Sequence, residues 1–430
     1  MARSLVLDSV GSEVERHEAI IAEYREVLSR PANPQRFEWK PLVIGPTWQM
    51  GEDGCYILPE HSLGWDIFGW CGTWLQHSRD VPWRYTPEQA RFVLWWYSLD
   101  DIGRFTFHDF VFQRLKGHGK DPLVATLMAV EMLGPCRFDG WDEDGQPIAR
   151  DVPEAWVQTA AVSLEQTKNT MRLFPGLFTP EAKKRFGLQI GKEKIYALGD
   201  ERLIEAVTSS PATLEGARAT AIFLNEPHHW TESNDGHEMA AVIARNAAKS
   251  PDGGARTGRI TNAYEPGEDS VAERDREAYE KMAAGQTRFT GMLYDSLEAP
   301  AEAPLTAEAA PSVVESIRGD STWLNPERIV QEILDPRNPP SRSRRFWYNQ
   351  ITAAEDAWTT PQEWDANRDE ALELVEGDQG VMFFDGSKSS VAIGLVFSRM
   401  SDGAVFVLGC WQRPDHVTEW SVPRDRVNDM

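Results

Sequence analysis

An apolar strand pattern, a glycine-rich turn and an apolar helix pattern follow one another near residue 110, and this succession constrains the fold most. Residues 104–113 are aromatic and β-branched, as a buried strand requires, and Gly117-His118-Gly119 follows directly. After Lys120-Asp121-Pro122, residues 123–133 form an unbroken apolar run that Gly134-Pro135 closes. The pattern predicts a strand, a tight loop and a helix, which together form the repeating unit of a parallel sheet.

Strands and helices continue to alternate after this unit. Apolar stretches at 156–162, 204–209 and 221–224 have the composition of strands, and residues 164–174 form a helical pattern. This alternation predicts an α/β fold, with a parallel sheet that has helices on both faces. Within residues 265–310 the sequence becomes a Pro-, Ala- and Glu-rich connector, which we interpret as a domain boundary.

Composition restricts the class of protein. With 44 Lys and Arg against 67 Asp and Glu, the 430-residue chain has a formal net charge of −23, which argues against a broad nonspecific nucleic-acid surface. No apolar run approaches the roughly 20 residues of a membrane span, and the N-terminus lacks the apolar core of a secretory signal. The four cysteines form no CxxC pair, which argues against a zinc ribbon. We expect a cytoplasmic protein whose charged helix Glu13–Leu28 is a peripheral arm.

The loop from Arg114 to Asp121 is similar to a phosphate-binding loop (Walker A). In such loops glycines let backbone N–H groups surround the phosphates, a lysine neutralises them, and a hydroxyl holds Mg²⁺. Here Arg114 stands in place of the first glycine, and Asp121 replaces the hydroxyl. The pattern alone leaves a simple strand-to-helix turn as the alternative.

A second polar element follows the apolar strand at 221–224. Asn225 and Glu226 stand where such ATPases have an aspartate for Mg²⁺ and a glutamate that activates the attacking water. His228 and His229 come next. Because their spacing fits no common zinc pattern, we interpret them as exposed histidines rather than metal ligands.

At these residues the chain resembles a known family, the large terminase subunits of tailed bacteriophages, especially those of phages that infect actinobacteria. The family's phosphate loop begins with arginine and ends in Gly-Lys, as here. Four other segments are similar to family motifs and occur in the family's order: Trp83–Gln89 (the adenine-side motif), Gln158–Thr167 (a strand-to-helix element), Ile204–Gly216 (the stretch before the acidic strand) and Arg259–Ala263 (the coupling motif).

The resemblance implies an ASCE-type P-loop NTPase sheet followed by a partial ribonuclease-H-like nuclease domain. The expected domains are an arm and aromatic-rich lead-in (1–82), the ATPase domain (83–296), a connecting subdomain (297–376) and the partial nuclease domain (377–430). It also implies a motor that hydrolyses ATP with Mg²⁺ and translocates double-stranded viral DNA into a procapsid. Its expected partners are the small terminase subunit, the portal protein and further copies in a ring, in the host cytoplasm and without a membrane.

The resemblance also implies roles for individual residues. Glu226 is the expected catalytic base, Arg114 is expected to stabilise the transition state, and Lys120 to neutralise the phosphates. The expected ATP contacts are Gln89, Arg114, Gly117, His118, Gly119, Lys120 and Asp121, and the coupling residues are Thr261 and Asn262. Gln89 also completes a helix-capping box with Thr86, and the two roles are compatible.

The departures from the family pattern suggest that two changes at the magnesium site compensate for each other. The usual hydroxyl and aspartate have become Asp121 and Asn225, so one carboxylate remains but has moved from the strand to the loop. Our hypothesis is that Asp121 is the charge partner of Mg²⁺ and that Asn225 orients a coordinated water, since Mg²⁺ accepts oxygen ligands of either kind. The alternative is that Asp121 and Pro122 only cap the helix.

The last 50 residues resemble the start of the family's nuclease domain. Asp385 ends an apolar strand and would bind Mg²⁺ or Mn²⁺, but Ser390 and Val391 stand where the family has an acid. Two-metal cleavage needs several converging carboxylates, and Asp402, Asp415 and Glu419 have the pattern of solvated loop residues. We therefore expect impaired or incomplete cleavage and a truncated or split domain.

The basic stretch before that domain is the best candidate for DNA contact. Four arginines alternate with aromatic residues there, namely Arg337, Arg342, Arg344 and Arg345. A solvated basic loop that pairs with the acidic connector is the alternative. Two rival functions also remain, an ATP-binding prophage remnant or regulatory protein without productive hydrolysis and a cellular helicase-like ATPase, although no helicase motif follows residue 265.

Overall fold

The computed structural model describes residues 13–32, 37–208, 215–250, 254–352, 367–369, 371–385 and 392–412. The chain divides into two compact units, residues 1–360 and residues 361–430. The first unit contains a nine-stranded sheet, and the second contains a three-stranded sheet.

The nine-stranded sheet has six parallel strands at its centre. In spatial order these are β15 (Met292–Glu298), β6 (Asp109–Gln113), β14 (Arg256–Thr261), β13 (Ala221–Asn225), β9 (Trp156–Ala160) and β12 (Arg202–Val207). Antiparallel strands complete both edges, β1 (Leu42–Ile44) beside β15, and β11 (Lys194–Ala197) with β10 (Gln189–Ile190) beyond β12. Strand β14 therefore lies between β6 and β13.

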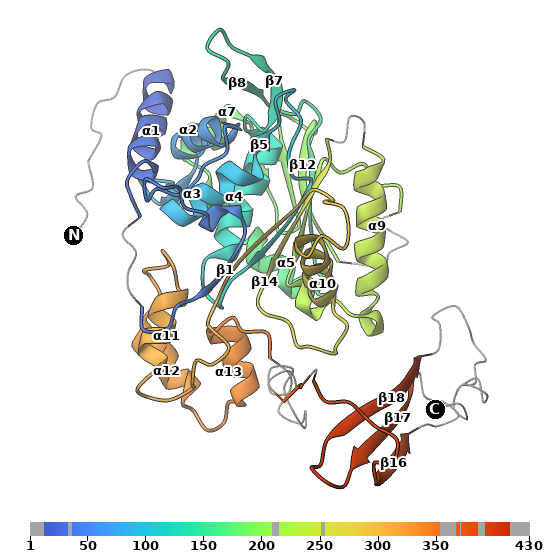
Figure 1. The fold of residues 1–430 in the computed structure, drawn as a ribbon. Helices are drawn as coiled ribbons and strands as arrows, with labels where there is room; N and C mark the ends of the chain where they lie inside the picture. Colours follow the sequence, from blue (N-terminus) through green and yellow to red (C-terminus); the bar gives the residue numbers. More distant parts are fainter. Residues whose placement is uncertain are drawn as a thin grey trace. The chain divides into compact units, whose positions relative to one another are not determined.

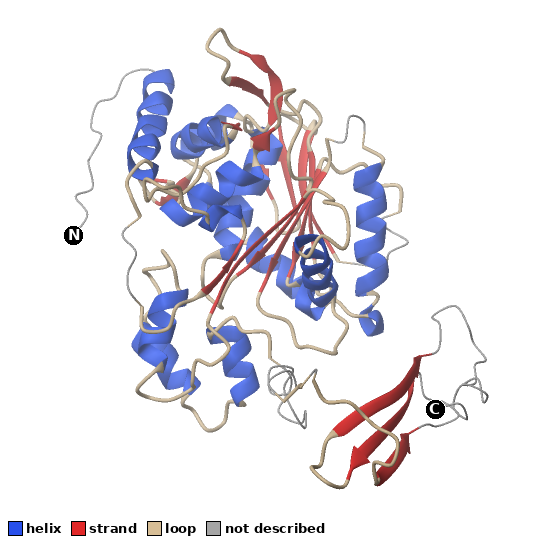
Figure 2. Ribbon diagram, in the orientation of Figure 1, coloured by secondary structure: helices blue, strands red, loops and turns tan. Residues whose placement is uncertain are grey.

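Helices cover both faces of this sheet (Figures 1 and 2). Strand β13 shows why, because its side chains alternate: Ala221 and Phe223 belong to the core that includes α4, whereas Ile222 and Leu224 belong to the core that includes α9. The first face is covered by α1 (Glu13–Leu28), α2 (Gly64–Trp74), α3 (Pro87–Trp96), α4 (Lys120–Leu133) and α5 (Leu164–Met171), and the second by α9 (Gly236–Ala248) and α10 (Val271–Ala283). The predicted three-layer α/β fold is confirmed.

Shorter elements complete the first unit. They are the helices α6 (Phe174–Leu177), α7 (Pro180–Arg185), α11 (Ala310–Ile317), α12 (Pro326–Ile333) and α13 (Pro340–Trp347), the 3-10 turns η1 (Pro46–Trp48), η2 (Pro227–His229) and η3 (Glu232–Asn234), and the strand pairs β2 (His61–Ser62) with β5 (Ser98–Leu99), β3 (Gln76–Ser78) with β4 (Val81–Pro82), and β7 (Arg137–Trp141) with β8 (Pro147–Arg150). Among the described residues, every helix falls short of the length and apolarity that a membrane span requires.

Strand β6 is shorter than the sequence pattern predicts. Residues 104–108 are not part of it, because the Asp100 carboxylate accepts a hydrogen bond from the backbone of Arg104 and closes a turn, and Leu99 forms an isolated bridge with Phe105. The aromatic pattern of this stretch therefore reflects packing against the core rather than one continuous strand.

The N-terminal helix is not a peripheral arm. Ile20, Tyr24 and Leu28 of α1 are buried in the main core, and the backbone N–H of Tyr85 donates a hydrogen bond to the Tyr24 hydroxyl at 2.6 Å. Strand β1 extends the central sheet. The lead-in is thus part of the same compact unit as the predicted ATPase domain, because its apolar face is buried against that domain.

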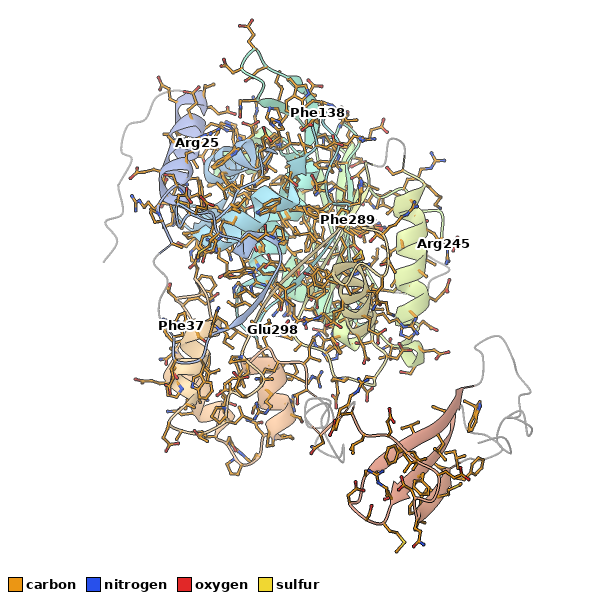
Figure 3. The ribbon with its side chains drawn as sticks, in the orientation of Figure 1. Arg25, Phe37, Phe138, Arg245, Phe289 and Glu298 are labelled. Carbon is orange, nitrogen blue, oxygen red and sulfur yellow. The ribbon has the colours of Figure 1, made fainter. Side chains whose placement is uncertain are left out.

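The expected boundary near residue 297 does not separate two compact units either. Residues 265–310 include α10 and β15, and β15 pairs with both β6 and β1. Glu298, labelled in Figure 3, ends β15 and accepts hydrogen bonds from Arg276 at 2.6 Å and from Gln113 at 3.2 Å. Helices α11 to α13 then form a small apolar core that includes Leu115 and Leu297.

The second unit contains β16 (Gly380–Asp385), β17 (Ala392–Arg399) and β18 (Val405–Gln412), paired antiparallel in chain order. The apolar strand expected to end at Asp385 is β16, and two further strands follow it. They agree with the first strands of a partial ribonuclease-H-like domain.

Candidate nucleotide-binding site

Three neighbouring parallel strands end at one edge of the sheet. Strand β6 leads into the loop from Arg114 to Gly119, β14 ends at Thr261, and β13 ends at Asn225. Because the carboxyl ends of parallel strands lie at the same edge, the loop, the predicted coupling residues and Glu226 come together there. Because β14 lies between β6 and β13, Thr261 and Asn262 lie between the loop and Glu226.

The loop has the backbone conformation of an anion-binding turn. Gly117 (φ +83°) and Gly119 (φ +98°) adopt left-handed conformations, and Gly119 begins α4 without a side-chain cap. The first N–H groups of α4 are therefore available to an anion at the positive end of the helix dipole. The Lys120 ammonium donates to the carbonyls of Arg114 and Leu115, both at 3.1 Å. Burial lowers the pKa of Lys120, although Glu226 and Asp121 oppose this shift.

The guanidinium of Arg114 lies inside the protein. It donates to Glu88 at 2.8 Å, pairs with Asp295, and is completely buried. Burial disfavours the charged forms, but pairing outweighs it for Arg114, whose pKa the two carboxylates raise, and for Glu88, whose pKa Arg114 and His118 lower. For Asp295 burial prevails and raises the pKa, although Arg114 opposes the shift. In this conformation Arg114 is not available for the predicted ATP contact, because contact would require two buried ion pairs to break. Glu88 and Asp295 had no recognisable sequence signal for this role.

Gln89 and His118 are both predicted ATP contacts, and their side chains contact different partners. Gln89 completes the predicted capping box, because its side chain accepts from Thr86 N–H at 3.2 Å and its own N–H donates to Thr86 Oγ1 at 3.3 Å. Its amide also lies beside the loop, 3.7 Å from the position that a Cβ at Gly119 would take. His118 is buried with Nε2 3.2 Å from Glu88. The capping role of Gln89 is confirmed and its adenine contact stays a prediction, whereas His118 offers only its backbone to a nucleotide.

The segment after α11 covers one side of the loop. The Ser321 hydroxyl donates to the carbonyl of His118 at 2.9 Å, and the Trp323 indole donates to that of Gly117 at 3.0 Å. On α13, the carbonyl of Phe346 accepts from the N–H of Lys116 at 2.8 Å. The predicted connecting subdomain is thus directly hydrogen-bonded to the loop.

The two predicted magnesium ligands are in contact. Asn225 Nδ2 donates to Asp121 Oδ1 at 3.1 Å and to Thr170 Oγ1 at 3.2 Å, and the Thr170 hydroxyl donates to Asp121 at 2.9 Å. Thr170 comes from α5, and nothing in its sequence context distinguishes it. A carboxylate, an amide and a hydroxyl are hard oxygen donors that suit Mg²⁺, so the side chains present fit this ion.

Glu226 has a strained backbone at the end of β13. Its φ of +54° is left-handed, and Pro227 follows it. Such strain in a non-glycine residue costs roughly 1–3 kcal/mol and is typical of functional positions. Burial raises the pKa of its carboxyl group, Lys120 opposes the shift, and Asp121 adds to it.

A chain of polar contacts connects Glu226 to the loop. His228 Nδ1 lies 3.1 Å from the Glu226 carboxylate and 3.0 Å from the Thr261 hydroxyl. Asn262 Nδ2 then donates to the carbonyl of Arg114 at 2.8 Å. The interpretation of His228 as an exposed histidine was wrong, because the 3-10 turn after Pro227 directs its ring inward; only His229 is exposed.

Glu226, His228 and His229 are also a possible set of metal ligands, since one ligand atom of each lies within 4.8 Å of the others. The surrounding charge is unfavourable for a cation. Arg345, Lys120 and Lys116 all act with burial to lower the pKa of His228 well below its usual value. This positive environment fits an anionic ligand such as a polyphosphate better.

The four predicted DNA-binding arginines do not form one open surface. Arg344 donates to Ala303 and Gln350 at 2.9 Å, and Arg345 pairs with Glu265 in the acidic stretch. Arg337 and Arg342 are exposed, and Arg337 pairs with Asp335. The alternative of pairing with acidic residues thus holds for Arg345, and DNA contact by the exposed arginines stays a prediction.

The predicted nuclease residues lie in the second unit. Asp385 is exposed at the end of β16, and Asp402 pairs with Arg399 at 2.7 Å. Among the residues that the structure describes, no cluster of three or more potential metal ligands includes Asp385. Ser390, Val391, Asp415 and Glu419 lie outside the described residues.

Two phage proteins are similar to the chain over most of its length. It is 38% identical to the gene 13 protein of Mycobacterium phage L5 over 449 aligned positions, which cover 92% of this chain and 75% of the relative. The gene 13 protein of Mycobacterium phage D29 is also 38% identical, over 451 positions with the same coverage. The crystal structure of the HK97 bacteriophage large terminase superimposes with a TM-score of 0.51 at 14% identity and covers 82% of this chain and 68% of that one. No family model matches the sequence.

Proposed function

The chain belongs to the family of the mycobacteriophage gene 13 proteins, and because it also has the fold of a large terminase, we propose that it is the ATP-hydrolysing motor subunit of a phage DNA-packaging machine. In this proposal it translocates double-stranded viral DNA into a procapsid. It acts as a homo-oligomeric ring on the portal protein, with a small terminase subunit, in the cytoplasm of the bacterial host.

One observation carries the proposal. The ends of β6, β14 and β13 bring together a glycine loop with a buried lysine, the pair Thr261-Asn262 and a strained glutamate. Hydrogen bonds join the first two groups and His228, and the glutamate lies 3.1 Å from His228. ATP hydrolysis needs a cradle for the phosphates, a base for the attacking water and a group that senses the phosphate. Lys120 and the backbone of residues 117–121 supply the cradle, Glu226 the base, and Thr261 and Asn262 the sensor.

Asp121, Asn225 and Thr170 would hold the magnesium ion. As the hydrogen bonds are arranged, Asn225 donates through its amide nitrogen, which leaves its carbonyl oxygen as the ligand atom. When bound, Mg²⁺ neutralises charge on the β- and γ-phosphate oxygens. The chain itself orients the nucleotide and accepts the proton of the attacking water.

For DNA contact we propose only two of the four predicted arginines, and we propose no DNA cleavage. The exposed Arg337 and Arg342 would contact the phosphate backbone, whereas Arg344 and Arg345 hold α13 in place. Asp385 would be a nuclease metal ligand. Cleavage is not part of the proposed activity, because two-metal catalysis needs several converging carboxylates.

Mg²⁺-dependent ATP hydrolysis by the purified chain tests the proposal, measured with and without double-stranded DNA beside Glu226→Gln. Turnover that DNA stimulates and that Glu226→Gln abolishes would support the motor. Turnover without DNA stimulation would indicate a generic ATPase. Tight ATP binding without turnover would favour an ATP-binding remnant or regulatory protein.

A further inference from the structure

His228 lies between the carboxylate of Glu226 and the hydroxyl of Thr261. Its Nδ1 is 3.1 Å from Glu226 Oε2 and 3.0 Å from Thr261 Oγ1, and its side chain has no exposed surface. The residues come from adjacent strands, since Glu226 follows β13, Thr261 ends β14, and His228 lies in η2. One imidazole nitrogen therefore links the ends of two strands.

The hydrogen bonds determine which ring nitrogen carries the proton. The Thr261 hydroxyl donates its hydrogen to the carbonyl of Asn262 at 2.8 Å. Because a hydroxyl has one hydrogen, this bond leaves Thr261 to accept from His228, and on this basis we assign the ring proton to Nδ1. Glu226 Oε2 lies 3.1 Å from the same nitrogen. Nε2 is then the bare nitrogen, and it is buried without a hydrogen-bond partner among the described residues.

The ring is fixed by its neighbours as well. The Phe346 ring lies edge-on at 6.3 Å between centroids, and the His229 ring lies at 4.0 Å. Phe346 also accepts a hydrogen bond from the phosphate loop through its carbonyl. Burial lowers the pKa of His228 well below its usual value, and the nearby His229 and Arg345 contribute. The imidazole is thus a neutral donor with a fixed orientation.

The Glu226 carboxylate needs a contact that fixes its orientation. It is on a flexible side chain, its backbone is left-handed, and 23% of its side chain is exposed. Among the described residues, His228 supplies the side-chain contact that can restrict the Glu226 rotamer. A catalytic base must lie within hydrogen-bond reach of its water, so its orientation affects the rate directly.

We propose that His228 is a positioning residue, which holds the Glu226 carboxylate through Nδ1–H and links its orientation to Thr261. This inference rests on the proposed ATP hydrolysis and adds to it a specific connection between base and sensor. His228 contacts neither the nucleotide nor the attacking water. A displacement of the end of β14 would change the orientation of the base through this ring.

Substitutions at His228 separate a positioning role from a merely structural one. We expect His228→Ala to lower kcat by about 10–100-fold, as misplacement of a catalytic group does, with KM for ATP and the Kd for ADP unchanged. His228→Asn should retain most of the activity, because its amide nitrogen replaces Nδ1. His228→Gln, whose amide reaches towards the position of Nε2, should resemble His228→Ala. His237→Ala, on α9, is the matched control and should behave as wild type.

A double substitution tests the link to Thr261. If His228 acts through that hydroxyl, His228→Ala combined with Thr261→Val should be no slower than the slower single variant, because both remove the same connection. Thermal unfolding of each variant corrects for loss of folded protein.

Three results would overturn the inference: wild-type kcat in His228→Ala, equal losses in the Asn and Ala variants, or fully additive losses in the double variant. A wild-type chain without ATP hydrolysis would overturn the proposed function and the inference with it. An active wild type that tolerates every change at His228 would overturn the inference alone.

Discussion

Strand β14 carries two polar clusters on the same side, and they differ in kind. Arg259 pairs with Asp109 and lies 3.1 Å from Asp275, all three being buried or nearly so. Thr261 is bonded to His228 and through it to Glu226. Side chains two residues apart on a strand point the same way, so the clusters are only about 7 Å apart along the strand.

We call the Arg259 cluster closed, because its cation and carboxylates are paired, and the Thr261 cluster open, because its carboxylate is paired with no cation among the described residues. Around Arg259, a cation faces two carboxylates from β6 and α10, so opposite charges are paired, although burial still raises the pKa of Asp275 against the effect of Arg259. Around Thr261, the Glu226 carboxylate lies beside an imidazole whose pKa burial lowers well below its usual value, rather than beside a cation, and the Glu226 backbone is strained. Both clusters contain buried atoms without a hydrogen-bond partner in the described part of the chain, since Arg259 Nε and Asp275 Oδ2 lack one as His228 Nε2 does. The difference lies in the charges and the backbone: paired opposite charges stabilise a fold, whereas a strained backbone at a non-glycine residue is typical of sites that bind or react.

Glu226→Gln should give the largest effect in the open cluster. We expect ATP turnover to fall by about 10²–10⁴-fold, the usual contribution of a general base, while ATP binding and the thermal unfolding midpoint stay nearly unchanged. Steady-state hydrolysis and equilibrium nucleotide binding measure this. Lys120→Ala is the contrasting variant, since it should weaken binding itself. A Glu226→Gln protein that fails to bind ATP would contradict the assignment.

Arg259→Met should give the largest effect in the closed cluster. It leaves Asp109 and Asp275 buried without a cation, which typically costs about 3–5 kcal/mol of unfolding free energy. Urea denaturation measures this loss, and a second change, Asp275→Asn, should recover part of it by removing one carboxylate. If Arg259→Met instead abolished hydrolysis at unchanged stability, the contrast between the clusters would be wrong.

Asp121→Asn tests whether the loop carboxylate of Asp121 replaces the aspartate that the family has on the strand at the magnesium site. We expect the Mg²⁺ concentration for half-maximal hydrolysis to rise by roughly 10–100-fold, as loss of a metal-site carboxylate interaction does. The double variant Asp121→Asn with Asn225→Asp should recover part of the loss, because it returns the carboxylate to the strand. Full activity in Asp121→Asn would leave Asp121 with a helix-capping role only.

Asp275→Asn should differ from wild type chiefly in how its stability changes with pH. Burial raises the pKa of Asp275 to about 7, although Arg259 opposes the shift and Asp109 adds to it. A carboxyl whose pKa is raised on folding stabilises the protein at low pH, and this contribution is lost between about pH 4 and pH 7, by at most about 1.4 kcal/mol per pH unit. The variant should therefore gain stability relative to wild type as pH rises. A constant difference from pH 4 to pH 8 would contradict this.

The two clusters also show where sequence reasoning reached its limit. Arg259–Ala263 is one motif in the sequence, yet Arg259 is ion-paired in the closed cluster while Thr261 and Asn262 belong to the open one. No local pattern distinguishes these halves, because the distinction depends on partners from β6, α10 and η2. His228 was misjudged for the same reason.

The sequence by itself determined the features that depend on neighbouring residues. Gly117 and Gly119 form the loop because only glycine readily adopts their left-handed backbone, Thr86 and Gln89 cap α3 within one turn, and the apolar run at 221–224 forms a buried strand. The strand, loop and helix order also predicted the parallel sheet. These features follow from steric and hydrogen-bonding preferences within a few residues.

Only the tertiary structure decided which polar groups meet. Arg114 is neutralised by Glu88 and Asp295, which are 26 and 181 residues away along the chain, and Asp121 meets Asn225 across 104 residues. Strand β1 joins the sheet at β15, so the N-terminal lead-in belongs to the core. Buried charges and amides take their partners from whatever the packed strands and helices bring within about 3 Å, and the order of strands in space is not written in any one segment.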